Sequence, residues 1–194
     1  MPRRDLTEER TEQILAAYER CVARFGLEGT SLERVAEEAE VKRSLLRHYV
    51  GNRDDLVLAM AERFGQRYRD QLQAMTQHIR EGQTRDLLDI LFAKTSSGDV
   101  HDVLIMEALI VASGQFDEIR ALVSLLVEET INAVRDQLRL TFPRADAKNV
   151  WTIAYGVVAI YFNLESLAPL RLPRRHRSSA RSAAGALIET LAPR

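Results

Sequence analysis

The fold of the N-terminal part is decided by residues 30–53, which read TSLERVAEEAEVKRSLLRHYVGNR. Apolar residues recur three or four positions apart, which predicts two short helices joined by a tight turn near Glu40. The second helix is basic, and no carboxylate lies between Glu40 and Asp54. A short cationic helix held against another short helix is the arrangement that enters the major groove of DNA. The stretch therefore predicts a sequence-reading DNA-binding module.

Charge and composition restrict the other possibilities. The 194-residue chain carries 27 Lys and Arg against 28 Asp and Glu, a formal net charge of −1. Any affinity for nucleic acid must therefore come from a local patch, and residues 42–53 supply one. With 46% hydrophobic and 28% charged residues, the chain has the composition of an ordinary folded protein that can bury a core.

Targeting, redox and metal signals are weak or absent in the sequence. The N-terminus reads MPRRD without an apolar signal region, and the longest apolar run, residues 150–164, is shorter than the roughly 20 residues of a membrane span. The single cysteine, Cys21, excludes an internal disulfide and a cysteine-rich zinc site. It falls in an apolar stripe, so a buried structural thiol is expected. We expect a soluble, cytoplasmic protein with no membrane span, no cofactor and no metal site.

Helical spacing continues along nearly the whole chain, and no alternating strand pattern occurs. The sequence predicts an all-α fold of about nine helices. Thr7 is a candidate cap and Gly26 a candidate stop for the first helix, and Thr30 or Ser31 can cap the second. A long helix from about Arg53 connects two regions. We divide the chain into a three-helix helix-turn-helix domain, residues 1–53, and a helical ligand-sensing and dimerisation domain, residues 54–194.

The helix predicted at residues 150–164 is apolar nearly all round. Such a helix is buried on every side, and in a chain of this size we expect the second partner to be another subunit. The final helix carries small residues that allow close packing. The residues predicted for the dimer interface are Val157, Tyr161, Ala180, Ala184 and Leu187. The alternative is a central helix within a monomeric bundle.

The chain resembles the TetR family of bacterial transcriptional repressors along its whole length, most specifically in a combination of motifs over residues 10–56. The matching residues are Arg10, Ile14-Leu15-Ala16-Ala17, Phe25-Gly26, Thr30-Ser31, Val35-Ala36, Ala39, Val41, Leu46, Tyr49, Gly51, Arg53 and Leu56. Three residues depart from the family pattern: Glu40 replaces a turn glycine, Lys42 a Ser or Thr cap, and Arg47 a tyrosine. Because glycine is favoured where a turn needs a positive φ, Glu40 predicts either mild strain or a different turn.

The resemblance implies a ligand-responsive, homodimeric transcriptional regulator, expected to be a repressor, that binds a near-palindromic operator in double-stranded DNA. Its second short helix, residues 42–49, would enter the major groove. Base contacts are expected from Arg43, Ser44, Arg47 and His48. Phosphate contacts are expected from Ser31, Lys42, Tyr49 and Arg53. The acidic Glu33, Glu37 and Glu38 must then point away from DNA, and a solvated basic face is the alternative interpretation.

The resemblance also implies that a small, largely apolar effector of unknown identity binds the C-terminal domain and releases the operator. The candidate pocket residues are Phe64, Phe92, Met106, Glu107, Ile110, Tyr155, Phe162 and Asn163. Plain core packing is the alternative for each apolar one. Glu107 lies in an apolar run where an unpaired carboxylate would be costly. It could pair with an internal arginine, face a crevice or receive a ligand group.

Two rival interpretations concern an enzyme and a protein-binding module. No catalytic residue is predicted: no histidine has a glutamate three positions before it, and no nucleophile elbow, phosphate loop or dinucleotide fingerprint occurs. The stronger rival is a helical, dimeric protein-interaction module that has lost sequence-specific DNA binding and uses the basic helix on an acidic protein. A second basic cluster is either a solvated loop and helix start or an added anion contact. It consists of Arg171, Arg174, Arg175, Arg177 and Arg181.

Overall fold

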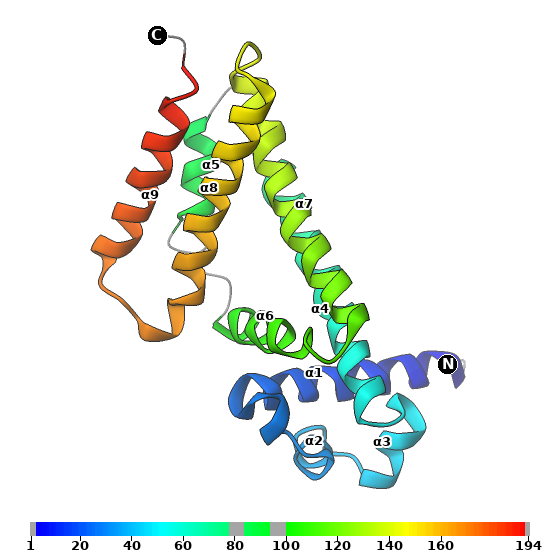
Figure 1. The fold of residues 1–194 in the computed structure, drawn as a ribbon. Helices are drawn as coiled ribbons and strands as arrows, with labels where there is room; N and C mark the ends of the chain where they lie inside the picture. Colours follow the sequence, from blue (N-terminus) through cyan, green and yellow to red (C-terminus); the bar gives the residue numbers. More distant parts are fainter. Residues whose placement is uncertain (1–2, 78–83, 94–99, 193–194) are drawn as a thin grey trace. The chain divides into compact units, whose positions relative to one another are not determined.

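The computed structural model describes residues 3–77, 84–93 and 100–192. Within these ranges the chain forms nine α-helices and one short 3-10 helix, without a strand, which confirms the all-α prediction (Figure 1). The helices are α1 Arg3–Gly29, α2 Leu32–Glu38, α3 Arg43–Val50, α4 Arg53–Gln77, α5 Thr84–Leu91, α6 Val100–Ala112, α7 Asp117–Thr141, α8 Ala147–Ser166, η1 Ala168–Leu170 and α9 Arg174–Glu189. The sequence also predicts that the fourth helix ends at residues 81–82 and that residues 95–99 form a loop, and both predictions fall outside the described residues.

The first helix differs from its prediction at both ends. It begins at Arg3, so Thr7 lies inside the helix and is not its cap; residues 3–10 are mostly good helix formers, which extend it toward the N-terminus. Gly26 has φ 70° and ψ 170°, which breaks the helical geometry, but the chain then continues in helical form to Gly29. The hydroxyl of Thr30 donates to the Gly26 carbonyl at 2.7 Å. The predicted stop is therefore a kink.

Contacts between residues divide the chain into two compact units. Unit 1 comprises the described residues 3–67 and 104–123, and unit 2 the described residues 68–77, 84–93, 100–103 and 124–192. The division passes through α4 between Arg67 and Tyr68. The functional division predicted after residue 53 falls inside unit 1 and stays a prediction.

Unit 1 packs α1 against α2 and α3. The apolar stripe that contains Cys21 is predicted to run along α1 from Ile14 to Phe25. It is buried from Ile14 to Val22, and burial raises the pKa of the Cys21 thiol. Phe25, the last predicted member of that stripe, is instead 40% exposed. The guanidinium groups of Arg24 and Arg34 lie 5.0 and 4.5 Å from its ring centroid. These cation–π contacts stabilise an aromatic ring outside the core.

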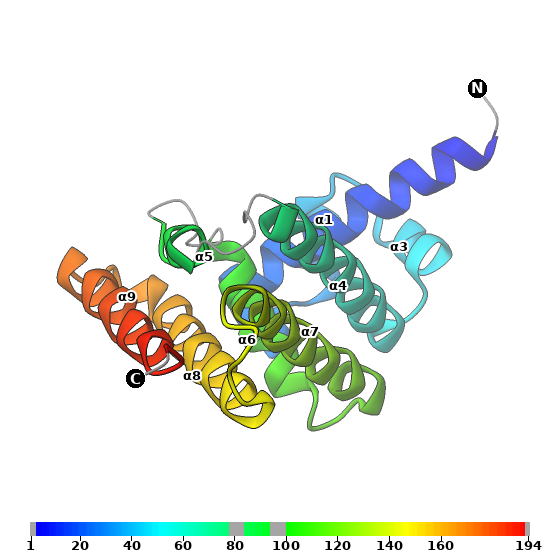
Figure 2. The same ribbon diagram turned by 90° about the horizontal axis from the view of Figure 1, so that it is seen from above.

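Unit 2 is built around α8 and α9, which lie side by side along their lengths (Figures 1 and 2). Asp146 caps α8 by accepting a hydrogen bond from the Asn149 amide at 3.0 Å. The core of unit 2 joins apolar residues of α5, α7, α8 and α9. Among the described residues, no helix is both long enough and apolar enough to cross a membrane.

Candidate nucleic-acid interface

The turn between α2 and α3 is set by a chain of local hydrogen bonds. Ser31 has extended backbone angles and caps α2, since its hydroxyl accepts from the Arg34 amide at 3.4 Å. At the other end, the Glu40 amide donates to the Glu37 carbonyl at 3.1 Å, and the Val41 amide to the Ala36 carbonyl at 3.0 Å. This pair of bonds is the Schellman arrangement, which places its C′ residue in the left-handed region. That residue is Glu40, with φ 53°.

The structure thus decides between the two alternatives for Glu40. The turn is of the type that glycine usually makes, and Glu40 makes it with a side chain that disfavours a positive φ. Local strain at this one residue is the consequence.

Replacing Glu40 with Gly is expected to raise the free energy of unfolding by about 0.5–1 kcal/mol, because it removes the strained side chain but adds backbone entropy to the unfolded chain. Urea unfolding measures the change. Glu37→Gly is the matched control, since Glu37 lies on the exposed side of α2 with helical backbone angles, and there glycine costs about 1 kcal/mol. Equal losses of stability in the two variants would contradict backbone strain at Glu40.

The outer face of α3 is basic and exposed. Leu46 and Val50 form its buried face, one helical turn apart. The helix starts after Lys42, whose extended backbone occupies the cap position without a side-chain hydrogen bond, as expected from the loss of Ser or Thr. The exposed residues are Lys42, Arg43, Ser44, Arg47 and His48, and Tyr49 is half-buried.

The apolar spacing of Val41, Leu45 and Leu46 predicts that all three face inward, but Leu45 is 41% exposed. Successive residues of a helix are about 100° apart, so once Leu46 points into the core, Leu45 lies toward the side. An exposed leucine beside the basic residues can contact the methyl group of thymine, a role that the sequence interpretation missed. The signal for it was the Leu46–Val50 spacing, which leaves Leu45 off the buried face.

Four of the predicted contact residues surround one open hollow of unit 1. Arg43, Ser44, Arg47 and Arg53 line it together with Leu32, Leu46, Gly51 and Asn52. The hollow brings side chains of α3 and of the first turn of α4 to one surface. His48 and Tyr49 lie outside this set, with their rings edge to face at a centroid distance of 5.1 Å.

Two of these arginines already have carboxylate partners. Arg43 pairs with Glu33 at 2.5 Å, with side chains 65% and 53% exposed. Glu33 therefore does not point away from the basic face as expected, and a hydrogen bond from its own backbone amide, with another from Ser31, lowers the pKa of its carboxyl. An ion pair this exposed is weak, so a phosphate or base can displace it. Glu38 lies elsewhere and pairs with Arg20 at 2.5 Å.

The Arg53 guanidinium is bound to residues at the C-terminal end of α1. It donates to the Leu27 carbonyl at 3.0 Å and pairs with Glu28 at 3.1 Å. A structural role in fixing the start of α4 thus accompanies the predicted phosphate contact. Lys42 and Arg47 are the basic side chains of this face for which the described residues supply no ion pair.

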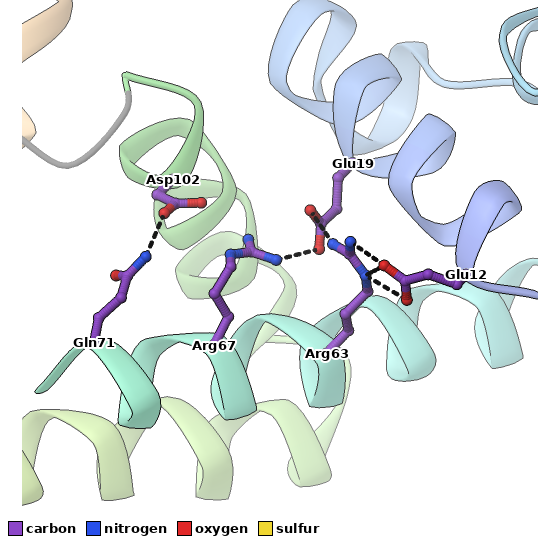
Figure 3. A network of polar contacts seen from close by, with 6 residues as sticks. All are labelled: Glu12, Glu19, Arg63, Arg67, Gln71 and Asp102. Atoms are coloured by element: carbon purple, nitrogen blue, oxygen red, sulfur yellow. Dashed lines mark hydrogen bonds and ion pairs between the residues drawn. The ribbon is translucent and has the colours of Figure 1, made fainter. Parts of the chain in front are cut away.

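An ion-pair network fastens α1 to the first half of α4 (Figure 3). Glu19 is buried, and its carboxylate meets Arg63 at 2.6 Å and Arg67 at 3.2 Å. Arg63 also donates through Nε to the Glu12 carboxylate at 2.9 Å. That hydrogen bond is the largest effect and lowers the pKa of Glu12, burial opposes it, and the charges of Arg63 and Arg67 add to the lowering. The network joins α4 to α1 and thereby to the three-helix head, α1 to α3. None of the family motifs indicated this connection.

Three of the eight residues predicted for the ligand pocket line cavities of the described chain, and each of the three lines a different one. Glu107 lines a cavity of unit 1, and Phe92 and Asn163 line two different cavities of unit 2. Phe64 is fully buried, Ile110 and Tyr155 are exposed, and Met106 and Phe162 are half-buried. Their part in ligand binding stays a prediction. The carboxylate of Glu107 is exposed, so it bears no burial cost, and facing a crevice is the interpretation that agrees with its position.

Two predicted dimer residues are core residues of unit 2. Val157 and Ala184 have no exposed surface, because α8 and α9 bury them against each other within one chain, and neither can contact a partner. Tyr161, Ala180 and Leu187 are half-buried and stay predictions. The aromatic side chains that α8 leaves exposed are Trp151 and Tyr155, whose rings stack at 5.8 Å. Because α8 is apolar nearly all round, its sequence alone cannot show which face of the helix is covered by α9.

Comparison with known proteins gives a match over the same N-terminal region. Residues 14–60 match the family model for bacterial regulatory proteins, tetR family. The chain is 35% identical over 88 residues to the HTH-type transcriptional regulator PksA of Bacillus subtilis (strain 168), which covers 45% of this chain. The match spans 40% of the length of PksA, less than half of that regulator.

Solved structures extend the likeness of fold to nearly the whole chain. A TetR transcription regulator from Haloarcula marismortui ATCC 43049 superposes with a TM-score of 0.76 at 16% identity, covering 94% of this chain and 98% of that one. A protein from Saccharomonospora viridis, described as a transcriptional regulator in complex with choline, gives 0.78 at 16% identity, with 94% and 96% covered. At these identities the likeness concerns the fold alone.

Proposed function

We propose that this chain, a member of the TetR family of bacterial transcriptional regulators, acts in the cytoplasm as a homodimeric repressor of a near-palindromic operator. The observation that carries the proposal is the exposed basic face of α3, presented by a buried Leu46–Val50 face on the opposite side. Arg47 and Ser44 are suited to base edges, since an arginine can donate to both acceptors of guanine. Lys42 and Ser31, at two helix starts, are suited to phosphates.

A dimer is supported by the exposed apolar surface of α8. Trp151 and Tyr155 stack on each other and remain open to solvent, as do Ala159 on α8 and Ala183 on α9. Large exposed aromatic side chains beside small residues are typical of a protein–protein interface. Two copies related by two-fold symmetry would place their recognition helices on half-sites roughly 34–36 Å apart.

Control by a small, largely apolar effector is part of the proposal. The effector would bind a conformation with altered spacing of the two recognition helices better than the DNA-bound one, and so lower operator affinity. The neighbour from Saccharomonospora viridis, described as a complex with choline, supports the capacity of this fold to hold a small molecule.

The test is selection from a pool of random duplex DNA by the purified full chain at physiological salt, followed by sequencing of the retained DNA. We expect a near-palindromic motif, a complex containing two 22.0 kDa chains, and an affinity that falls linearly with salt on a logarithmic scale. Salt-labile binding without sequence preference would overturn the proposal and favour the dimeric protein-interaction module.

A further inference from the structure

An open cleft lies within unit 1, apart from the basic face of α3. Its volume is about 470 Å³, within the usual range for small-molecule sites. One wall is the end of α1, a second is the first turn of α4, and the third is α6 with the turn that follows it. Glu107, which is not part of the predicted DNA-binding surface, lines this cleft.

The α6 wall is apolar although it faces the cleft. Leu104, Ala108 and Val111 line it at helical spacing together with the buried Ala112, while Ile105 and Leu109 are buried on the core side. Val111 is 74% exposed, and the aromatic ring of Phe116 lines the cleft just beyond α6. A helix needs only one apolar face to hold its place in a protein. The second apolar face of α6 therefore offers contact surface to something other than its own core.

The rim of the cleft carries more negative than positive charge. Its ionisable residues are Glu28, Arg53, Asp54 and Glu107. The Arg53 guanidinium pairs with the Glu28 carboxylate and neutralises it, and it also donates to the Leu27 carbonyl. Within the described chain, no ion pair joins the Asp54 or Glu107 carboxylate to a basic group. Two uncompensated carboxylates thus remain beside an apolar wall.

A buried polar group adjoins the same site. Tyr18 is 1% exposed, and its hydroxyl is the buried side-chain atom that lacks a hydrogen-bond partner in the described part of the chain. Burial raises the pKa of Tyr18 to about 12, and the charges of Arg53, Glu28 and Asp54 also act on it. All three belong to the cleft, and Tyr18 precedes the cleft residue Val22 by one turn of α1. Tyr18 itself does not line the cleft, so its hydroxyl lies close to the charges gathered there but is not a contact for an occupant.

We propose that this cleft binds a small organic cation with an apolar body, such as an alkyl-substituted ammonium. The apolar residues of α6 would contact the body, and Asp54 and Glu107 would attract the cationic head. The ring of Phe116 adds a surface that favours cations. An anion of the same size would be repelled by the rim, and a neutral analogue would lose the electrostatic part.

A regulatory role for this cleft rests on the proposed function. Asp54 lies in the first turn of α4, and only Gly51 and Asn52 separate α4 from the recognition helix α3. An occupant in contact with that turn would act on α3 through the shortest connection that the chain offers. Binding itself can be measured without DNA, so the two proposals can fail separately.

The test is isothermal titration of the full chain with hexyltrimethylammonium, in parallel with hexanol and hexanoate. We expect saturable binding of one cation per chain, at least fivefold tighter than either analogue and weakened by salt. The double variant Asp54→Asn, Glu107→Gln should lose at least fivefold in affinity for the cation. Ala108→Trp, which fills the cleft, should abolish binding without altering the rim charges.

Glu62→Gln is the matched control, since it removes an exposed carboxylate of α4 that is not part of the cleft. Circular dichroism of each variant shows whether it is folded, and a variant that fails to fold is replaced by its single substitutions. Equal binding of the three probes, or unchanged cation affinity in both cleft variants, would overturn the site. Loss of cation binding with operator recognition intact would leave the proposed function standing.

Discussion

Reversing the charge of Arg47 by substitution with Glu is expected to weaken operator binding at least a hundredfold. Arg47 is exposed on the outer face of α3, and the described residues provide it with no ion pair, so its guanidinium is free to reach DNA. Loss of a bidentate contact to a base weakens the binding free energy by about 1–3 kcal/mol, and a carboxylate in place of the guanidinium is also repelled by the phosphates. The selected operator, labelled and titrated at constant salt, gives the affinity.

Arg139→Glu is the control for this substitution. Arg139 is exposed near the end of α7 in unit 2, so the same change of net charge occurs away from the basic face. We expect a change of less than threefold in its operator affinity and no change in thermal unfolding for either variant. If Arg47→Glu bound the operator within threefold of the natural chain, α3 would not be the reading helix.

The helix-turn-helix could be predicted because its determinants are local. Ser31 caps α2 through a residue three positions away, and Leu46 and Val50 define one face of α3 within a single turn. Even the unusual Glu40 was visible as a conflict between residue type and turn geometry, and its positive φ bears this out. Signals that act over three or four residues can be recognised in the sequence without knowledge of the tertiary structure.

The remaining features depend on residues far apart in the chain. Which face of α8 is buried is decided by α9, and therefore the interface prediction was wrong for Val157 and Ala184. The cleft beside Glu107 needs α1, α4 and α6 together, so an apolar run around a glutamate could not reveal that its carboxylate is exposed. Arg43 and Glu33 belong to different helices, and only the tight turn brings them to 2.5 Å.

The network of Figure 3 is the strongest case of this kind, and it carries the largest expected effect on stability. Glu19 and Arg63 are 44 positions apart in sequence, yet the Glu19 side chain is only 4% exposed and meets two guanidinium groups. Glu19→Gln keeps the shape but removes the charge that both arginines face. Because breaking a buried ion pair leaves uncompensated charge, we expect the free energy of unfolding to fall by about 2–3 kcal/mol, measured by urea unfolding.

Glu12→Gln tests whether burial, rather than the mere presence of an ion pair, produces that loss. Glu12 pairs with the same Arg63, but its side chain is 59% exposed, so we expect a loss below about 1 kcal/mol. The pKa of Glu12 is lowered in the folded protein, and its contribution is therefore present above the unfolded pKa and disappears as pH falls through the folded one. Equal losses for the two substitutions at neutral pH would show that water screens both carboxylates alike. A larger loss for Glu19→Gln would show that the buried carboxylate, held between α1 and α4, is what anchors the three-helix head to α4.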